Sequence, residues 1–247
     1  MKLIYLIQKA WIQQTRDKLS LILLISTTPI LFLLYYSITL GESKEFLILL
    51  ILLSVIMVVF SSSIVVAKEK ESKTIIRLIL AEIPYYQGII GVCLVQFFLS
   101  IISILFTFIF FYFYEIYNIE ILIKFYYFAI INSLTSIWIG ASVGSLTRNT
   151  FKAFTISSLL MFLLLLLSGA LFPIPRKEIL LLHTIHLSLF DLIPSNLFLQ
   201  SIYSILESNQ TQSGNLLLQN SLLSFFYFVV AIAFFQISKT KKVNDEL

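Results

Sequence analysis

Six long stretches of this chain contain no Asp, Glu, Lys or Arg, and each is about as long as a membrane-spanning helix. A charged side chain at the centre of a bilayer costs at least about 2.5–3.5 kcal/mol, so charge-free stretches are the segments that can cross it. The composition agrees, because 59% of the 247 residues are apolar and only 12% are charged. An ordinary soluble domain has about 25% charged residues. A soluble enzyme and a disordered chain are therefore excluded, and the sequence predicts a multi-pass membrane protein.

The six stretches predict an all-α integral membrane fold in a single domain, residues 1–247. A helix rises about 1.5 Å per residue, so each stretch is long enough to cross about 30 Å of hydrocarbon. The predicted spans are about 19–40, 46–67, 88–112, 125–146, 153–172 and 216–237. The segments outside them are too short or too apolar for a catalytic domain.

The distribution of Lys and Arg predicts the orientation of the spans. If the N-terminus is inside, thirteen basic residues lie on the cytoplasmic side and only four lie outside: Lys44, Lys124, Arg176 and Lys177. Cytoplasmic loops of membrane proteins carry an excess of Lys and Arg. Both termini are therefore expected in the cytoplasm.

Two shorter apolar runs, Ile179–Phe190 and Leu192–Leu206, precede the last span, and Pro194 separates them. Neither is long enough to cross the bilayer comfortably. Backbone that enters a membrane without crossing it must bury its polar groups in the protein. We therefore expect a re-entrant helical hairpin on the outer side, within residues 176–210.

Residues 1–18 form an amphipathic pattern. On a helical projection, Lys2, Lys9, Gln13 and Arg16 share a polar stripe, and Ile4, Ile7 and Trp11 lie opposite. This pattern predicts a helix that lies flat on the inner leaflet with its lysines near anionic headgroups. Two interpretations stay open: a basic flank that only sets topology, or a packed interfacial helix that belongs to the transport machinery.

The cytoplasmic segment 68–84 joins the second and third predicted spans. Alternating charges come first, and a short helix is expected to begin near Ser72 and to end before Pro84. Its apolar face consists of Ile75, Ile76, Leu78 and Ile79. A solvated connector is one interpretation. A docking helix for a soluble partner is the other, and it accounts for the branched apolar residues.

Small residues occur in two of the spans. Ser136, Gly140, Ser142 and Gly144 lie mostly four residues apart, which suits close helix packing within the chain or, as the less favoured alternative, a dimer seam. Gly169 allows close helix approach near the end of the fifth span, and Pro173 and Pro175 stop the helix there.

The sequence contains no motif for catalysis or ATP binding. A G-x-x-x-x-G-K-[ST] loop is absent, as are H-E-x-x-H and G-x-S-x-G. His183 and His186 lack a third metal ligand nearby, and Cys93 is the single cysteine. We therefore predict no catalytic residue and no metal site. The net charge of +4 is too small to indicate nucleic-acid binding.

Several short motifs occur in an order that resembles the permease subunit of type-2 ABC transporters. In that family the loop after the second span reads like E-R-E-x-G-T, followed by leucines and a proline. Here it reads Glu69-Lys-Glu71-Ser-Lys73-Thr74, followed by Leu78 and Pro84, with Lys73 in place of the glycine. The pairs Arg148-Asn149, Ser168-Gly169 and Phe172-Pro173 also resemble the family pattern.

The resemblance implies a subunit of an ATP-driven exporter in the plasma membrane of a prokaryote. Two permease subunits, identical or related, would form the translocation path. Separate cytoplasmic ATPase subunits would bind ATP and Mg²⁺, so this chain would need no cofactor of its own. The residues implied in coupling to the ATPase are Glu69, Glu71, Thr74, Arg77 and Leu78, and those implied in an outer gate are Gly169, Phe172, Pro173 and Pro194. The substrate would be a drug or a lipid-linked, peptide or polysaccharide molecule.

Three alternatives stay open beside this hypothesis. One is a haem-exporter-type permease, which is similar in its number of spans. Another is an intramembrane enzyme that uses His183, His186 and Asp191. The third is a membrane-anchoring assembly partner without a transport role.

Overall fold

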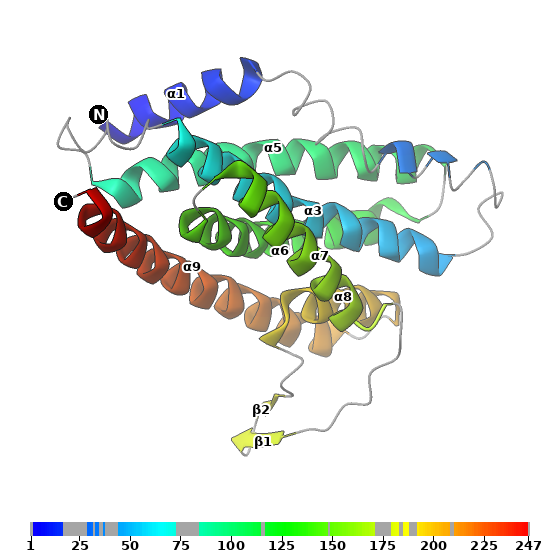
Figure 1. The fold of residues 1–247 in the computed structure, drawn as a ribbon. Helices are drawn as coiled ribbons and strands as arrows, with labels where there is room; N and C mark the ends of the chain where they lie inside the picture. Colours follow the sequence, from blue (N-terminus) through cyan, green and yellow to red (C-terminus); the bar gives the residue numbers. More distant parts are fainter. Residues whose placement is uncertain are drawn as a thin grey trace.

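The computed structural model describes most of the chain as a bundle of long helices (Figure 1). The described residues are 2–16, 29–31, 33–34, 37, 44–72, 84–114, 117–147, 149–170, 179–182, 185–187, 192–207 and 210–246. The helices are α1 (Lys2–Arg16), α3 (Lys44–Glu71), α5 (Tyr85–Phe113), α6 (Ile119–Leu146), α7 (Thr150–Leu167), α8 (Pro194–Leu206) and α9 (Gln210–Glu246). Two short strands, β1 (Ile179–Leu182) and β2 (Ile185–Leu187), complete the described elements.

Five helices in the described part of the chain are long and apolar enough to cross a membrane. Their apolar segments are Ile48–Glu71, Tyr86–Phe113, Ile119–Leu146, Thr150–Leu167 and Gly214–Gln236. They correspond in position to the second through sixth predicted spans. The first predicted span, 19–40, falls mainly outside the described residues, where only 29–31, 33–34 and 37 are seen as helix.

Close packing of α6 against α3 forms the centre of the bundle. Gly140 is directly against the carbonyl of Val59, and Gly144 is against the carbonyl of Ser63. A Cβ atom at either glycine would overlap backbone atoms of α3. Glycine lets two helix backbones approach in this way. The small residues of α6 thus serve packing within the chain, as favoured from the sequence.

Two groups of buried apolar side chains hold the helices together. Near the Phe111 end of α5, one group joins α3, α5, α6, α8 and the first part of α9 and includes Ile51, Phe111, Phe125 and Phe198, each essentially inaccessible to solvent. The second group joins α3, α5 and α6 to α9 and to Ala10 of α1. Phe235 of α9 is fully buried in it. Lipid tails are as apolar as these side chains, so in a bilayer it is their close packing contacts that hold the helices together.

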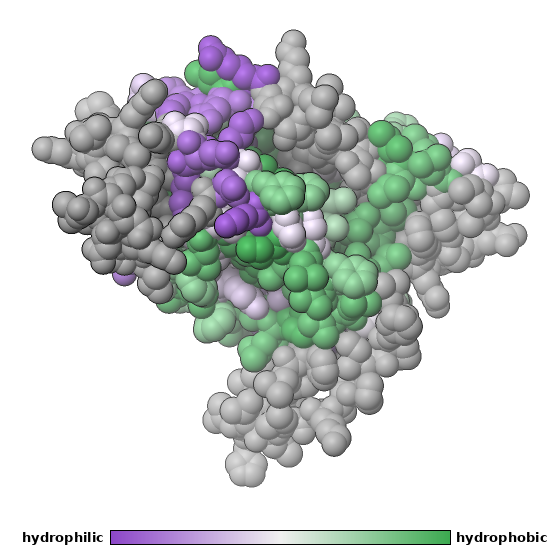
Figure 2. Space-filling view, in the orientation of Figure 1, coloured by the Kyte–Doolittle hydropathy of each residue, from purple (hydrophilic) through white to green (hydrophobic). Residues whose placement is uncertain are grey.

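The outer faces of α7 and α9 are apolar and exposed. Phe151, Leu159 and Phe162 of α7 are 75%, 62% and 57% exposed, and Phe225 of α9 is 64% exposed. Apolar residues cover much of the visible surface of the bundle, as Figure 2 shows in green. A soluble monomer rarely exposes so much apolar surface, so these faces suit lipid or another subunit.

The region before α9 differs from the expected helical hairpin. The prediction of a helical first arm is wrong, since the described backbone forms two antiparallel strands, in which Ile179 pairs with Leu187 and Leu180 with His186. A short aliphatic run has no periodicity that distinguishes strand from helix. The second arm is indeed a helix, α8, which begins at Pro194 and is largely buried. At 13 residues, α8 is too short to span the bilayer.

Candidate functional site

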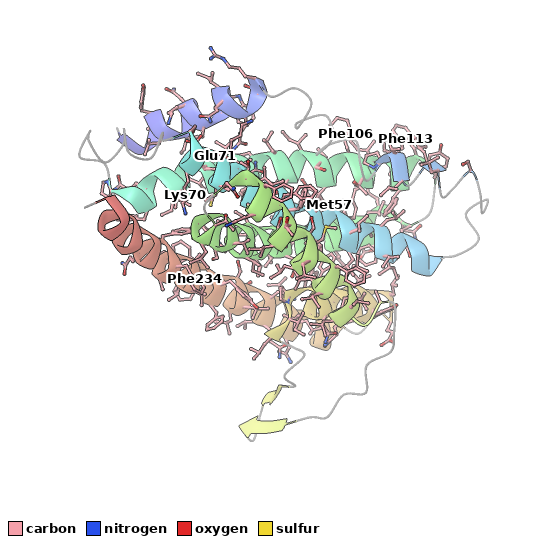
Figure 3. The ribbon with its side chains drawn as sticks, viewed as in Figure 1. Met57, Lys70, Glu71, Phe106, Phe113 and Phe234 are labelled. Carbon is pink, nitrogen blue, oxygen red and sulfur yellow. The ribbon has the colours of Figure 1, made fainter. Side chains whose placement is uncertain are left out.

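Four charged residues follow the apolar part of α3: Lys68, Glu69, Lys70 and Glu71. This end of α3 meets the turn between α6 and α7, and Figure 3 shows Lys70 and Glu71 beside the start of α7. We call the last turn of α3 (68–72), the described residues of the α6–α7 turn (147, 149 and 150) and Lys9 of α1 the junction. Its side chains connect four helices, as follows.

Glu71 caps the N-terminus of α7 from another helix. Its Oε2 accepts a hydrogen bond from the backbone N–H of Thr150, over 3.0 Å, and one from the Thr150 hydroxyl, over 2.7 Å. Asn149 caps the same helix locally, since its Oδ1 accepts from the backbone N–H of Lys152 over 3.0 Å. The first N–H groups of a helix lack intrahelical partners, and negative charge is favourable there. Glu71 thereby fixes the start of α7 relative to α3.

Lys70 caps the C-terminal end of α6. Its Nζ donates hydrogen bonds to the carbonyl oxygen of Ser145, near the end of α6, and to that of Thr147, over 2.8 Å. The last carbonyls of a helix lack intrahelical partners, and a cation is favourable beside them. Two successive residues of α3 thus bind the end of one helix and the start of the next, each with the charge that suits that end.

Glu69 connects α3 to α1. Its side chain is buried, and its carboxylate lies 3.9 Å from Nζ of Lys9. On the buried face of α1, Leu6 contacts Gly91 of α5, where an added Cβ would lie only 3.2 Å from Cβ of Leu6. Of the two interpretations of residues 1–18, the structure supports the packed helix, because α1 contacts α3 and α5. Its location at a membrane interface stays a prediction.

A second set of hydrogen bonds, further along α1, joins this helix to the bundle. Gln96 of α5 donates through Nε2 to Oε1 of Gln14 over 3.3 Å, and Ser61 of α3 donates to Oε1 of Gln96, also over 3.3 Å. These bonds place α1, α5 and α3 in a fixed relation at the same end of the bundle.

The predicted coupling residues divide into two groups. Glu69 and Glu71 lie in the junction and bind within the chain. Thr74, Arg77 and Leu78 lie outside the described residues, as does most of the segment 68–84. The junction therefore contains the first residues of the segment 68–84, in which docking was predicted.

The predicted gate residues are near the other end of α7. Gly169 has a φ of 82°, a conformation that glycine adopts readily, in the turn that ends α7. Its role is thus in the turn and not only in close helix approach. Pro194 is buried at the first turn of α8, where the fixed φ of proline suits a helix start. The next residue, Ser195, donates to the carbonyl of Leu164 over 2.7 Å and so binds α8 to α7. Phe172 and Pro173 lie outside the described residues.

Sequence reasoning missed a buried polar network inside the bundle. Asn132 of α6 donates to the amide oxygen of Asn220 of α9 over 2.9 Å, and Asn220 donates to the hydroxyl of Ser201 of α8, also over 2.9 Å. All three side chains are buried. Two Asn residues in otherwise apolar spans were a readable signal, because amides in a bilayer need partners. No comparable feature of the sequence indicated the capping roles of Lys70 and Thr150.

The described residues contain no group of three or more His, Cys, Asp or Glu side chains placed to hold a metal ion. Of the residues proposed for an intramembrane enzyme, His183 and Asp191 lie outside the described part, and only the backbone of His186, in β2, is described.

The sequence was also compared with known proteins. No curated protein matches the chain. The family model described as "ABC-2 type transporter" matches residues 1–191, which is more than half of the chain and includes the junction and helices α1, α3, α5, α6 and α7. The chain therefore belongs to the ABC-2 type transporter family, as a membrane-spanning permease subunit of a type-2 ABC transporter.

Proposed function

We propose that this chain is the permease subunit of an ATP-driven exporter in the plasma membrane of a prokaryote, with both termini in the cytoplasm. Two permease subunits would form the translocation path, and separate ATPase subunits would dock on the segment 68–84. Family membership supports the proposal, since permeases of this family normally pair with an ATPase subunit. The excess of Lys and Arg on one side supports the orientation.

The junction is the observation that carries the proposal of ATPase coupling. The proposed docking segment begins at the last turn of α3, where Lys70 binds the end of α6 and Glu71 binds the start of α7. A displacement of this segment would therefore move three helix ends together. Rigid-body shifts of packed helices are a usual form of conformational change in such proteins. The ATPase must contact the two arrangements differently, because equal contacts would shift no equilibrium.

The geometry suggests different tasks for the residues proposed in coupling. Glu69 is buried against Lys9, so it is a poor surface for a partner. We propose that Glu69 and Glu71 transmit motion within the chain, whereas Thr74, Arg77 and Leu78 contact the ATPase directly. The outer gate would lie at the distal end of α7, with Gly169 and Pro194 at the two helix ends that Ser195 joins.

Co-purification of the complex tests this division of tasks. The chain with Arg77→Glu is expected to lose the ATPase, while Glu71→Gln is expected to retain it with lower ATP turnover. Glu120→Gln is the matched control, since Glu120 is an exposed carboxylate in an (i,i+4) pair with Lys124 at 2.8 Å, away from the junction. It is expected to change neither quantity.

Isolation of the native complex tests the transport role itself. Mass spectrometry of its subunits is expected to find an ATPase, and analysis of bound small molecules would indicate the substrate class. If the unmodified chain is active in a complex without any nucleotide hydrolase, the proposed function is wrong.

A further inference from the structure

A groove of about 810 Å³ lies between α1 and the end of α3. Tyr5, Lys9, Ile12 and Arg16 line it along one row of α1, because residues three and four apart share a helix face. Lys68 lines it from α3, and Gln8 and Gln13 complete it. Figure 2 shows hydrophilic residues gathered over this end of the molecule.

The charges of the groove are mostly positive. Lys9, Arg16 and Lys68 carry positive charge, the described lining residues include no carboxylate, and Lys9 is paired with the buried carboxylate of Glu69. An anion in the groove would therefore meet a net positive charge. Arg in particular binds phosphate oxygens through two parallel N–H groups, and the glutamines can donate to hydroxyl or ester oxygens.

The apolar side chains around the groove indicate its depth in the membrane. Ile12 and Tyr5 are 52% and 65% exposed, and Trp11 on the same helix is 40% exposed. Tyr and Trp are enriched where hydrocarbon meets the headgroups. Lys68 directly follows Ala67, the last residue of the apolar part of α3. Exposed apolar side chains and cations therefore alternate along the groove, a composition that suits the headgroup level of a bilayer.

We propose that this groove binds the phosphodiester headgroup of an anionic phospholipid. Its cations contact the phosphate, and Ile12 and Tyr5 contact the beginning of the acyl chains. An acidic segment of a protein partner would satisfy the cations but not the exposed apolar side chains, which favours lipid. The proposal requires only that the chain is inserted in a membrane. Its assignment to the inner leaflet rests on the proposed orientation, and it is independent of the proposed ATPase coupling.

Fluorescence from position 5, which lines the groove, measures lipid there. The chain has two tryptophans, Trp11 and Trp138, so Tyr5→Trp combined with Trp11→Phe and Trp138→Phe leaves position 5 as the sole emitter. The full chain is placed in vesicles of phosphatidylcholine that contain either brominated phosphatidylglycerol or brominated phosphatidylcholine, both of which quench nearby Trp. We expect stronger quenching by the anionic lipid at equal content. Equal quenching by both lipids would overturn the proposal.

Charge-removing variants locate the site. Each of Arg16→Gln and Lys68→Gln is expected to lower the preference for the anionic lipid roughly 5-fold, as for the loss of one surface cation. Lys152→Gln is the matched control: Lys152 is exposed near the start of α7, outside the groove. It is expected to keep the preference. If Lys152→Gln lowers it as much as Lys68→Gln, the effect is general surface charge and the site does not exist.

Two competitors distinguish other occupants of the groove. Inorganic phosphate is expected to leave the quenching by phosphatidylglycerol unchanged, and displacement would assign the groove to a soluble anion instead. Addition of the ATPase is also expected to leave it unchanged. If the ATPase abolishes the preference, and Arg16→Gln weakens ATPase binding, the occupant is protein and the proposal is wrong. Because the first measurements use the permease alone, they hold whether or not an ATPase couples to it.

Discussion

The carboxylate of Glu71, at the end of α3, accepts hydrogen bonds from both the backbone N–H and the hydroxyl of Thr150, at the start of α7. These residues are far apart in sequence and lie in different helices. The neighbouring Lys70 binds carbonyls at the end of α6. A single turn of α3 therefore binds the end of one helix and the start of the next.

Loss of the Thr150 hydroxyl is expected to weaken this cap. Thr150→Val should lower the free energy of unfolding by about 1 kcal/mol, the usual effect of losing a capping hydrogen bond. The measurement is the thermal unfolding midpoint of the purified chain in detergent. Thr155→Val is the control, because among the described residues the exposed Thr155 hydroxyl donates to the Phe151 carbonyl of its own helix. Equal midpoints for the two variants would contradict the assigned role of Thr150.

The pair of Lys9 and Glu69 is expected to be coupled in a double-mutant cycle. Lys9→Gln leaves the buried Glu69 carboxylate without this cation. Its cost should lie between the about 1 kcal/mol of a surface pair and the about 3–5 kcal/mol of a fully buried one. Lys9→Gln combined with Glu69→Gln should recover part of the loss. Strictly additive effects on the unfolding free energy would show that the two side chains do not interact.

Alanine at the α6 glycines is expected to disrupt the bundle. Gly140→Ala or Gly144→Ala would place a methyl group against backbone carbonyls of α3, which cannot move as a side chain can. Such overpacking costs about 1–3 kcal/mol or more. Gly214→Ala in α9 is the control, since nothing lies within 4 Å of an added Cβ there. Size-exclusion profile and unfolding midpoint measure the difference. Wild-type behaviour of Gly144→Ala would mean that α3 and α6 do not pack this closely.

Removal of the Asn220 amide is expected to loosen α8. Asn220→Ala leaves Asn132 and Ser201 each without one buried partner, at a cost of about 1–3 kcal/mol. Protease cleavage within α8 should then become faster. The control is Ser221→Ala, because the exposed hydroxyl of Ser221 donates to the carbonyl of Leu217 in its own helix in the described part of the chain. An unchanged cleavage rate in Asn220→Ala would show that α8 is held by its apolar contacts alone.

Accessibility labelling tests the orientation. In a Cys93→Ser background, Asn118→Cys is expected to react with a membrane-impermeant maleimide in intact cells. Ser72→Cys is expected to react only after the membrane is permeabilised. Both residues are exposed in the structure, so the difference reports the side of the membrane and not burial. The reverse pattern would place the junction outside and exclude docking of a cytoplasmic ATPase.

Much of the helical framework was predictable from local patterns. The five described membrane-crossing helices coincide with charge-free stretches, because the cost of a charge in hydrocarbon acts on each segment separately. The small residues of α6 also indicated a close contact, although not its partner. The strands at 179–187 were not predictable, since short aliphatic runs favour neither helix nor strand by their pattern.

The amino-acid sequence by itself determined which segments of this protein can enter a bilayer, and it determined the family. Whether a segment can enter a bilayer depends on the side chains of that segment and on the solvent around it. Only the tertiary structure decided that Lys70 and Glu71 cap two different helices, that Glu69 faces Lys9, and that Asn132 meets Asn220. A charged or amide side chain binds whichever unpaired group lies within about 3 Å of it. Helix packing, and not local sequence, brings that group there.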